Sequence, residues 1–415
     1  MFQPTDTAKD ASVQVLAPSS LPSGEWDAFA AQARDEVDRP FSAKRIAALG
    51  ALSGKVLNHS RLRRETAATA LGFWLRPSSL ARFESEFRAV AGGACRVPAG
   101  LVFHVTPANV DTMFVYSWAL AFLTGNANIV RLSTRTSPLV SDLLQCLNEV
   151  FSAHCDACGG NAFISYGHND AVTAALSSRC DLRVVWGGDE TVARLRAVPL
   201  NPHAAERSFA SKRALSVFSA PAYLGEVEAV RGELAARMAA DILPFAQMAC
   251  SSPHVVYWLG AQEPAREATE DFGRRLELAM SAKSEEADLG AAVRRLNFAF
   301  SAVAAGRCDA VLQQAHTTQL HATSAEHAET TEVCGAGLLT HTAVPDVRAV
   351  CTYLGRHHQT ITYFGLNESE RNDLAYLAGT RGVDRVVAAG KALNFGPYWD
   401  GYSLWDDFTR VVVIE

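Results

Sequence analysis

The chain has 415 residues, 48% of them hydrophobic and 20% charged, with a formal net charge of −6. This composition excludes extensive disorder, and the acidic balance argues against nucleic acid as a partner because it provides no basic footprint. The length favours two domains.

The longest strongly apolar run, Met113 to Leu123, is too short to span a bilayer, so we expect no membrane insertion. The N-terminus lacks the basic and apolar regions of a signal peptide. Nine cysteines are scattered without regular spacing, which is typical of reduced thiols in a cytoplasmic enzyme. No metal site is expected, since Cys155 and Cys158 form a single C-x2-C pair without a second one.

The first half of the chain alternates strands and helices after a polar arm over residues 1–25 and a mainly helical region. Such alternation predicts a parallel sheet with both faces covered by helices. The expected elements are helices over residues 26–87, a strand over 101–105, a buried helix after Asn109 that ends at 124–126, a strand over 127–133, a helix over 137–154, a strand over 161–167, a helix over 170–179 and a strand over 181–188.

The second half repeats this alternation after a change of character near Ser208. We expect a strand over 211–221, a helix over 224–248, a strand over 254–258, helices over 264–281 and 284–305, and strands over 336–344, 359–366, 383–390 and 408–415. These elements predict a second α/β domain.

Three local features carry chemistry. Gly187 and Gly188 follow a strand and precede a helix, a turn that favours an anion at the helix N-terminus, although many such turns carry glycines for steric reasons. The sequence has no G-x-G-x-x-G, which disfavours a conventional Rossmann dehydrogenase. Asn109 is interpreted locally as a helix N-cap or as an oxyanion donor. Cys250 is either a small core residue or a nucleophile at a helix-to-strand junction.

The order of the segments distinguishes these alternatives. "TPANV", "GGDETVARL", "FASK", "QMACSSP" and "TEVCGAG", followed by "YWDGYSLWDDF", resemble the aldehyde dehydrogenase superfamily over residues 95–415. Within it the chain is most similar to the acyl-CoA reductases of the bioluminescence type, the long-chain fatty acid reductases. The resemblance implies two Rossmann-like α/β domains with a small oligomerisation element: a flexible arm over residues 1–25, a dinucleotide-binding domain over 26–213, a catalytic domain over 214–405 and an oligomerisation strand over 406–415.

The resemblance also implies roles for particular residues. Cys250 stands at the position of the catalytic nucleophile, and Asn109 at that of the asparagine that stabilises the oxyanion. The implied cofactor contacts are Arg131, Ser133, Gly187, Gly188, Thr191 and Glu332.

Two departures from the superfamily pattern narrow the expected activity. Ser208 stands where hydrolytic members have the glutamate that activates water, so an acyl-cysteine should persist, unless Glu206 takes that role. "RLST" at residues 131–134 lacks a carboxylate that binds ribose hydroxyls and keeps a cation, which favours NADPH over NADH.

The sequence therefore predicts an aldehyde-forming oxidoreductase that reduces an acyl thioester with NADPH through an acyl group on Cys250. The acyl donor would be coenzyme A, a carrier protein or a partner acyl-protein synthetase, and the enzyme would be a homo-oligomer. The alternatives are a hydrolytic NAD(P)-dependent aldehyde dehydrogenase and a cofactor-free cysteine acyltransferase.

Overall fold

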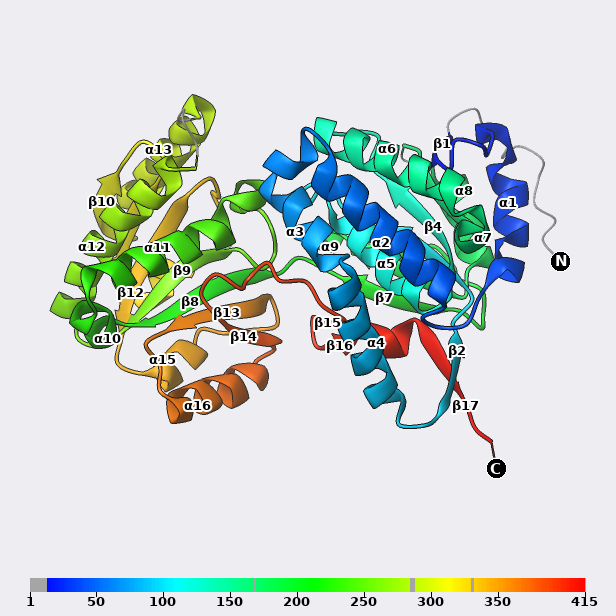
Figure 1. Ribbon diagram of the computed structural model, residues 1–415. Helices are drawn as coiled ribbons and strands as arrows, with labels where there is room; N and C mark the ends of the chain where they lie inside the picture. Colours follow the sequence, from blue (N-terminus) through cyan, green and yellow to red (C-terminus); the bar gives the residue numbers. More distant parts are fainter. Residues whose placement is uncertain (1–12, 168, 284–287, 330–331, 415) are drawn as a thin grey trace. The chain divides into compact units, whose positions relative to one another are not determined.

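The computed structural model describes residues 13–167, 169–283, 288–329 and 332–414. The chain forms two compact units, residues 1–210 with 397–415 and residues 211–396. Figure 1 shows both units.

The first unit contains a six-stranded sheet with the order β1-β5-β4-β3-β6-β7. β1 is antiparallel to β5, and the other neighbours are parallel. The strands are β1 (Gln14–Ala17), β3 (Leu101–Val105), β4 (Ala127–Leu132), β5 (Asn161–Ser165), β6 (Leu182–Trp186) and β7 (Ala205–Phe209). The expected parallel sheet is thereby confirmed.

Helices cover both faces of this sheet, because successive side chains of each strand point to opposite sides. On β5, Ala162 and Ile164 belong to a core cluster that includes residues of α1, α8 and α9. Phe163 between them packs its ring 5.4 Å from that of Trp118 on α5. The helices are α1 (Trp26–Gln32), α2 (Ala43–Asn58), α3 (Thr66–Trp74), α4 (Pro77–Ala91), α5 (Met113–Leu123), α6 (Pro138–Ala153), α7 (Cys155–Cys158), α8 (Asp170–Arg179) and α9 (Asp189–Arg196).

The helix after Asn109 ends as the sequence predicts. α5 is buried along its whole length, and its C-cap is Thr124. Gly125 follows at φ +92, and a Cβ there would lie 2.0 Å from the carbonyl oxygen of Asp38. The left-handed backbone and this close approach both require glycine.

The C-terminal segment of the chain belongs to the first unit. Arg207 donates to both carboxylate oxygens of Asp407, at 2.8 and 2.6 Å, and Asn126 donates its side-chain N–H to Phe408 O at 2.9 Å. Strand β17 (Thr409–Val412) pairs antiparallel with β2 (Cys95–Pro98). β15 (Tyr398–Trp399), β16 (Tyr402–Ser403) and α17 (Leu404–Asp407) precede this strand in the chain and belong to the same unit.

The second unit contains a seven-stranded sheet with the order β10-β11-β12-β9-β8-β13-β14. Among the described strands of this second sheet, only β10 runs antiparallel to its neighbour. The strands are β8 (Arg213–Ser219), β9 (Pro253–Leu259), β10 (Cys308–Gln313), β11 (Thr318–Ala322), β12 (Leu338–Val344), β13 (His358–Phe364) and β14 (Arg385–Ala388).

Two core clusters lie on opposite faces of this second sheet. Tyr257 belongs to the cluster that includes residues of α15 and α16, whereas Trp258 belongs to the one that includes residues of α11 and α12. The helices are α10 (Ala220–Gly225), α11 (Glu228–Ile242), α12 (Gln262–Ser281), α13 (Leu289–Ala304), α14 (Ala325–Ala328), α15 (Val347–Cys351) and α16 (Glu368–Gly379). The fold is therefore α/β in both units.

The elements differ from the sequence expectation in several places, and strands β2, β7, β10 and β11 were not expected. Residues 14–17 of the expected arm form β1, which pairs with β5, while residues 1–12 lie outside the described residues. The first unit ends at residue 210 rather than 213, and residues 397–405, expected in the catalytic domain, return to it. The helix expected over 224–248 ends at Ile242, because the backbone becomes left-handed from Phe245. The helix expected over 284–305 begins at Leu289, and residues 284–287 lie outside the described part.

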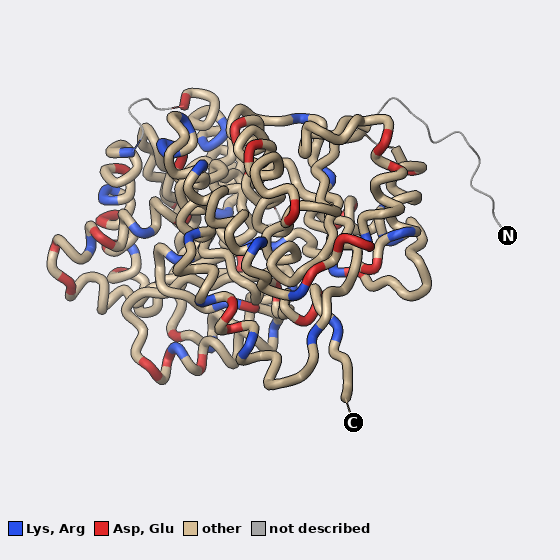
Figure 2. Tube along the Cα trace, turned by 45° about the vertical axis from the view of Figure 1, so that its right-hand side comes forward, with Lys and Arg blue, Asp and Glu red and all other residues tan. Residues whose placement is uncertain are grey.

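Charges of both signs are interspersed along the chain. Figure 2 shows Lys and Arg and Asp and Glu dispersed along the trace among other residues. Of the helices in the described ranges, none combines the length and hydrophobicity needed to cross a membrane.

Candidate active site

The first sheet has a topological switch point at β3. The chain leaves β3 toward β4 and β5, then returns to the other side of β3 with β6 and continues outward to β7. In open α/β sheets, ligands bind outside the carboxyl ends of the strands at such a point. The segments that follow β3, β4 and β6 are therefore the candidate nucleotide contacts of this unit.

Asn109 lies at this carboxyl edge, in the turn between β3 and α5. Its side chain is exposed. The N-cap of α5 is Thr112, so Asn109 does not occupy the capping position that its local sequence suggests. The capping role that the local sequence suggests is therefore not the role of this residue.

Gly187 and Gly188 form the expected turn between β6 and α9. Gly187 donates its N–H to Phe209 O at 3.1 Å, so this amide serves the sheet. A Cβ at Gly187 would lie 3.1 Å from the side chain of Thr191, which packs over the turn. The N–H groups that α9 offers to an anion are those of its first turn, where helices have no intrahelical acceptors. Asp189 and Glu190 are exposed in that turn.

Arg131 is the penultimate residue of β4, and its side chain reaches the end of β5. Its guanidinium donates to Tyr166 O at 3.0 Å and lies 5.3 Å from the Tyr166 ring centroid. Burial lowers the pKa of Arg131, and the charge of the nearby Arg194 on α9 lowers it further. Two cations therefore lie near each other where a phosphate group would relieve their repulsion.

Ser133 lies beside a small pocket between the ends of β3 and β4. The pocket is lined by Thr106, Pro107, Asp111, Ser133, Arg135 and Thr136, among others. Ser133 Oγ accepts a hydrogen bond from the backbone N–H of Arg135 at 3.2 Å. This pocket combines hydroxyl groups with the exposed cation of Arg135.

Glu206 and Ser208 lie on β7, and Glu206 is held in an ion pair. Its Oε2 accepts from Arg183 Nε at 2.7 Å, and its Oε1 from Ser208 Oγ at 2.8 Å. Although burial alone raises it, the hydrogen bonds from Ser208 and Arg183 hold the pKa of Glu206 below its ordinary value. A carboxylate so occupied is poorly suited to activate water.

In the second unit, the candidate residues lie at the amino edge of the sheet. β8, β9, β12 and β13 are parallel, so the segments that precede them reach the same edge. Cys250 lies in the turn before β9, and Glu332 in the segment before β12. The structure thereby brings the loops that carry these two residues to one side of the sheet.

The backbone before Cys250 is strained. Phe245, Ala246 and Gln247 have φ angles of 55°, 51° and 66°, and each left-handed residue other than glycine costs about 1–2 kcal/mol. Ser252 then fastens the following turn, since its Oγ donates to Asp241 O at 2.8 Å. Cys250 itself is half-buried. Strain of this kind concentrates at functional sites, where the surrounding structure maintains it.

Most of the other cysteines are poor nucleophiles. Burial raises the pKa of Cys146 to about 11 and those of Cys158 and Cys180 to about 12, and it also raises the pKa of Cys308, Cys334 and Cys351. A thiol with a raised pKa stays protonated at neutral pH, and the thiolate is the nucleophile.

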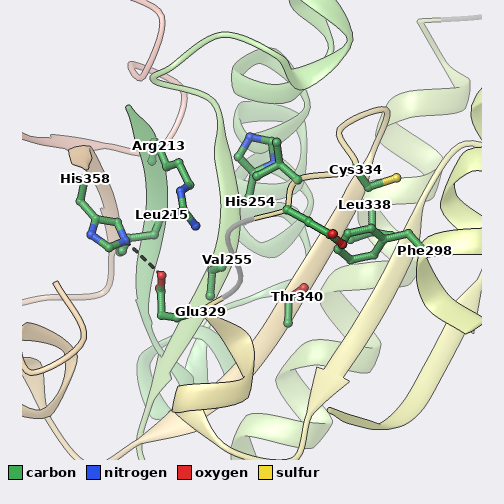
Figure 3. A pocket seen from close by; sticks show the side chains of 13 residues that line it. Arg213, Leu215, His254, Val255, Phe298, Glu329, Cys334, Leu338, Thr340 and His358 are labelled. Atoms are coloured by element: carbon green, nitrogen blue, oxygen red, sulfur yellow. Dashed lines mark hydrogen bonds and ion pairs between the residues drawn. The ribbon is translucent and has the colours of Figure 1, made fainter. Parts of the chain in front are cut away.

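A pocket opens at this amino edge (Figure 3). It is lined by Arg213, His254, Phe298, Glu332, Cys334 and Thr340, among others. Burial, assisted by the charge of Arg213, lowers the pKa of His254 to about 4, so its imidazole is neutral at pH 7. The pocket thus combines apolar walls with a cation, a carboxylate and a neutral imidazole, as ligand sites commonly do.

Glu329, His357 and His358 could together hold a metal ion by their spacing, but hydrogen bonds already occupy two of them. Glu329 accepts from Tyr257 OH at 2.6 Å and contacts His358 Nε2 at 3.1 Å. His358 Nδ1 accepts from the Gly355 N–H, so Nε2 carries the proton and donates to Glu329. In this tautomer neither nitrogen of His358 can bind a metal.

The structure groups the predicted residues by unit. Arg131 lies within β4 of the first sheet, Asn109, Ser133, Gly187, Gly188 and Thr191 follow parallel strands of that sheet, and Cys250 and Glu332 precede strands of the second. Sequence analysis missed Arg194 and Gln247. Arg194 lies in the second turn of α9, and no sequence motif distinguishes it. Gln247 has no sequence signal either, because its neighbours predict a helix.

Solved structures identify the fold. The chain is similar to aldehyde dehydrogenase 21 from Physcomitrella patens in complex with succinate (TM-score 0.67, 13% identity, 94% of this chain and 88% of that one). It is also similar to 3,6-anhydro-L-galactose dehydrogenase in complex with NAP (0.66, 13%, 93% and 90%). A third similar structure is indole-3-acetaldehyde dehydrogenase AldA from P. syringae in complex with NAD+ (0.61, 13%, 96% and 86%). The two units therefore have the aldehyde dehydrogenase fold, as the sequence predicts.

Within that fold, the chain belongs to the acyl-CoA reductase (LuxC) family, whose model matches residues 46–411. No curated protein matches the chain. The protein is therefore an oxidoreductase, and the activity that the family supports is the reduction of a fatty acyl group to an aldehyde.

Proposed function

We propose that this enzyme reduces an acyl thioester, a fatty acyl-CoA or a carrier-bound acyl group, with NADPH through an acyl group held on Cys250. The observation that carries the proposal is the position of Cys250. It is a half-buried cysteine that follows a strained left-handed turn at the sheet edge where the Glu332 segment also ends. Membership of the acyl-CoA reductase family supports the same reaction.

In the first step, the Cys250 thiolate attacks the thioester carbon, and a new C–S bond forms. The oxyanion of the tetrahedral species accepts hydrogen bonds from the Asn109 side-chain amide and the backbone N–H of Cys250. The bond to the donor sulfur then breaks, and coenzyme A leaves as a thiolate that takes up a proton from water. The acyl group remains on Cys250.

NADPH, when bound, supplies the hydride that reduces this acyl carbon. Asn109 then holds the resulting thiohemiacetal oxyanion as it held the first one. When the oxyanion reforms its C=O bond, the C–S bond to Cys250 breaks, which releases the aldehyde and regenerates the thiolate.

The residues of the first unit fit a phosphorylated nucleotide. Arg131 and Arg194 place two positive charges near the end of β4, and Arg135 lies beside the Ser133 pocket. A 2′-phosphate would pair with these cations, which is the basis for proposing NADPH rather than NADH. The first-turn N–H groups of α9, next to Gly188 and Thr191, would hold the pyrophosphate, and Glu332 the nicotinamide ribose.

The chain also protects the acyl group from water. Ser208 has no basic group, and Glu206 is engaged with Arg183 and Ser208. This arrangement supports acyl reduction over the hydrolytic alternative.

The test is intact-protein mass spectrometry after mixing the enzyme with a panel of acyl-CoAs without NADPH. We expect a stable adduct of acyl mass on Cys250 that disappears on adding NADPH and is absent in Cys250→Ser. No adduct from any donor would overturn the proposal. An acyl adduct that persists after NADPH is added, on an enzyme that does not bind NADPH, would indicate a cysteine acyltransferase. An enzyme that forms acid from aldehyde with NAD(P), but no aldehyde from acyl-CoA, would indicate a hydrolytic dehydrogenase.

We also propose that the enzyme is a homo-oligomer and that an acyl-protein synthetase can serve as the acyl-donating partner. The support for the oligomer is strand β17. One edge pairs with β2 in the same chain, and the strand and the residues after it expose apolar side chains, namely Val411, Val412, Val413 and Ile414. Light scattering of the wild type and of Val411→Lys tests this, since a monomeric wild type would contradict it.

A further inference from the structure

The side chain of Gln247 bridges two loops of the second unit. Gln247 is fully buried. Its Nε2 donates to Pro253 O at 2.7 Å and to Leu338 O at 3.0 Å, and its Oε1 accepts from the Gly337 N–H at 2.8 Å. One amide therefore uses both donors and its acceptor on backbone groups that lie up to 91 residues away in sequence.

These backbone groups lie where two neighbouring strands begin. The paired register of β9 with β12 starts at Val255 and Thr340, whereas Pro253 and Leu338 are the first residues of the two strands. The amide of Gln247 thus continues the pairing beyond the end of the ladder. It fixes the two strand entrances relative to each other.

A second contact lies beside this bridge. Ala246 O accepts from the Ala336 N–H at 2.8 Å, and a Cβ at Gly335 would lie 2.7 Å from the same oxygen. Gly335 has φ +68, so close approach and backbone conformation both require glycine here. The left-handed turn of residues 245–247 is therefore held directly against the loop that leads to β12.

The loop leading to β12 is also anchored from its other side. Arg295 of α13, which is buried, donates to Ala336 O at 2.9 Å and to Ala315 O at 2.6 Å. With α13 fixing one side of this loop, the Gln247 bridge transmits a defined position to the turn that carries Cys250, three residues further along the chain.

We propose that Gln247 is a positioning residue that holds the Cys250 turn and the Glu332 loop in one fixed arrangement, so that the nucleophile and the nucleotide contact are placed by the same amide. The catalytic significance of this arrangement rests on the proposed function. The effect of the Gln247 side chain on the environment of Cys250 and on the Glu332 loop can be measured without turnover.

The experiment compares wild type with Gln247→Met, which keeps the length of the side chain and removes all three hydrogen bonds. The first readout is the alkylation rate of Cys250 by iodoacetamide against pH, followed by peptide mass spectrometry. The exposed Cys95 and Cys155 serve as internal references. We expect the pH of half-maximal alkylation of Cys250 to rise by at least half a unit, because backbone N–H groups around the thiolate lose their fixed orientation.

The second readout is nucleotide affinity, measured by fluorescence titration with NADPH. We expect the Kd to rise at least threefold in Gln247→Met through displacement of the Glu332 loop. The matched control is Gln319→Met, which removes another buried glutamine of the same sheet, whose Oε1 contacts the side-chain Nε2 of His341 at 2.8 Å. Both variants should lower the Tm, but only Gln247→Met should change the two readouts.

An alkylation profile of Cys250 that matches the wild type overturns the inference, as does the same change in Gln319→Met. An unchanged Kd for NADPH in Gln247→Met overturns the link to the Glu332 loop. Because alkylation needs no acyl donor and no nucleotide, its result stands even if the wild type forms no acyl adduct, which is the outcome that would overturn the proposed function instead.

Discussion

The hydroxyl of Ser208 donates a hydrogen bond to Oε1 of Glu206 at 2.8 Å. Ser208 occupies the position at which the hydrolytic superfamily pattern has its glutamate, and Glu206 is the carboxylate two residues away along β7. Since Glu206 also accepts from Arg183 Nε at 2.7 Å, this carboxylate is committed to a hydrogen-bonded ion pair. Neither residue therefore offers a free base at the position where the resemblance to the superfamily leads us to expect one.

The ion pair of Glu206 is expected to stabilise the fold. Glu206→Ala should lower the free energy of unfolding by about 3 kcal/mol at pH 7, because it leaves the buried guanidinium of Arg183 without its carboxylate. The folded-state pKa of Glu206 is lowered, so this contribution is complete above the ordinary value of 4.5 and is lost as the pH falls through the lowered pKa. Urea unfolding from pH 7 down to pH 3 measures the difference.

The matched control is Glu86→Ala, which breaks the exposed pair of Arg82 and Glu86 and should cost less than about 1 kcal/mol. A difference between wild type and Glu206→Ala that stays constant down to pH 3 would contradict the ion-pair account.

A carboxylate at position 208 should restore hydrolysis. We expect Ser208→Glu to shorten the lifetime of the acyl group on Cys250 by about 100-fold, the lower end of what a general base contributes. The neighbouring Glu206 raises the pKa of a new carboxyl group toward neutrality, which suits a base. The measurement is decay of the acyl adduct by intact-protein mass spectrometry without NADPH.

Ser208→Gln has the size of the glutamate without its basicity and is the control for this experiment. Equal lifetimes in Ser208→Glu and Ser208→Gln would show that position 208 does not face the acyl group. Glu206→Gln should leave the lifetime unchanged, and a longer lifetime there would revive Glu206 as the base.

Sequence patterns predicted the parts of the fold whose signals are local. β3 and β6 are buried, mostly apolar runs with one polar residue each, and Ser137 caps α6 by accepting from the Val140 N–H, as its place before a proline indicates. β1, β2, β7, β10 and β11 were missed. β1 and β2 have four residues each, and after Cys308 β10 alternates exposed with half-buried side chains at a sheet edge, so these three strands do not stand out from loops.

The candidate site was less predictable because its key contacts are not local. The position of Cys250 in chain order suggested its role, but the left-handed turn before it contradicts the helix that "DILPFAQM" indicates. Gln247 reads as one more helical residue until its contacts with Gly337 and Leu338 are known, about 90 residues later in the chain. Arg194 became a candidate only because the fold places α9 near the end of β4.

Arg131 should determine the preference for a phosphorylated nucleotide. In Arg131→Gln, the Kd for NADPH should rise at least tenfold while that for NADH changes less than twofold, because a hydrogen bond to a charged group contributes about 1.5–3 kcal/mol. Fluorescence titration with the two nucleotides measures both values. Arg82→Gln, at an exposed cation on α4, is the control. Parallel weakening of NADPH and NADH in Arg131→Gln would assign the side chain to the shared part of the nucleotide.

His104 on β3 should make the first unit sensitive to acid. The imidazole is fully buried between Ser117 Oγ at 2.8 Å and Asn128 Oδ1 at 3.1 Å. Asn128 Oδ1 can only accept, so the neutral imidazole donates through Nε2 and its Nδ1 accepts the hydroxyl proton of Ser117, whose oxygen in turn accepts from Trp186 Nε1. This satisfied network holds a neutral histidine, and burial lowers its pKa from 6.5 to about 4.

A base with a lowered folded-state pKa gains its proton first in the unfolded chain. The stabilisation from neutral His104 is therefore complete above pH 6.5 and is lost between pH 6.5 and 4, at about 1.4 kcal/mol per pH unit. His254 and His341 have lowered pKa values as well and add to the wild-type slope in the same direction. The contribution of His104 is isolated by urea unfolding of His104→Gln over this range, where the slope should fall by about one proton. The exposed His203→Gln should keep the full slope, and an unchanged slope in His104→Gln would show that His104 takes up its proton without opening the core around β3.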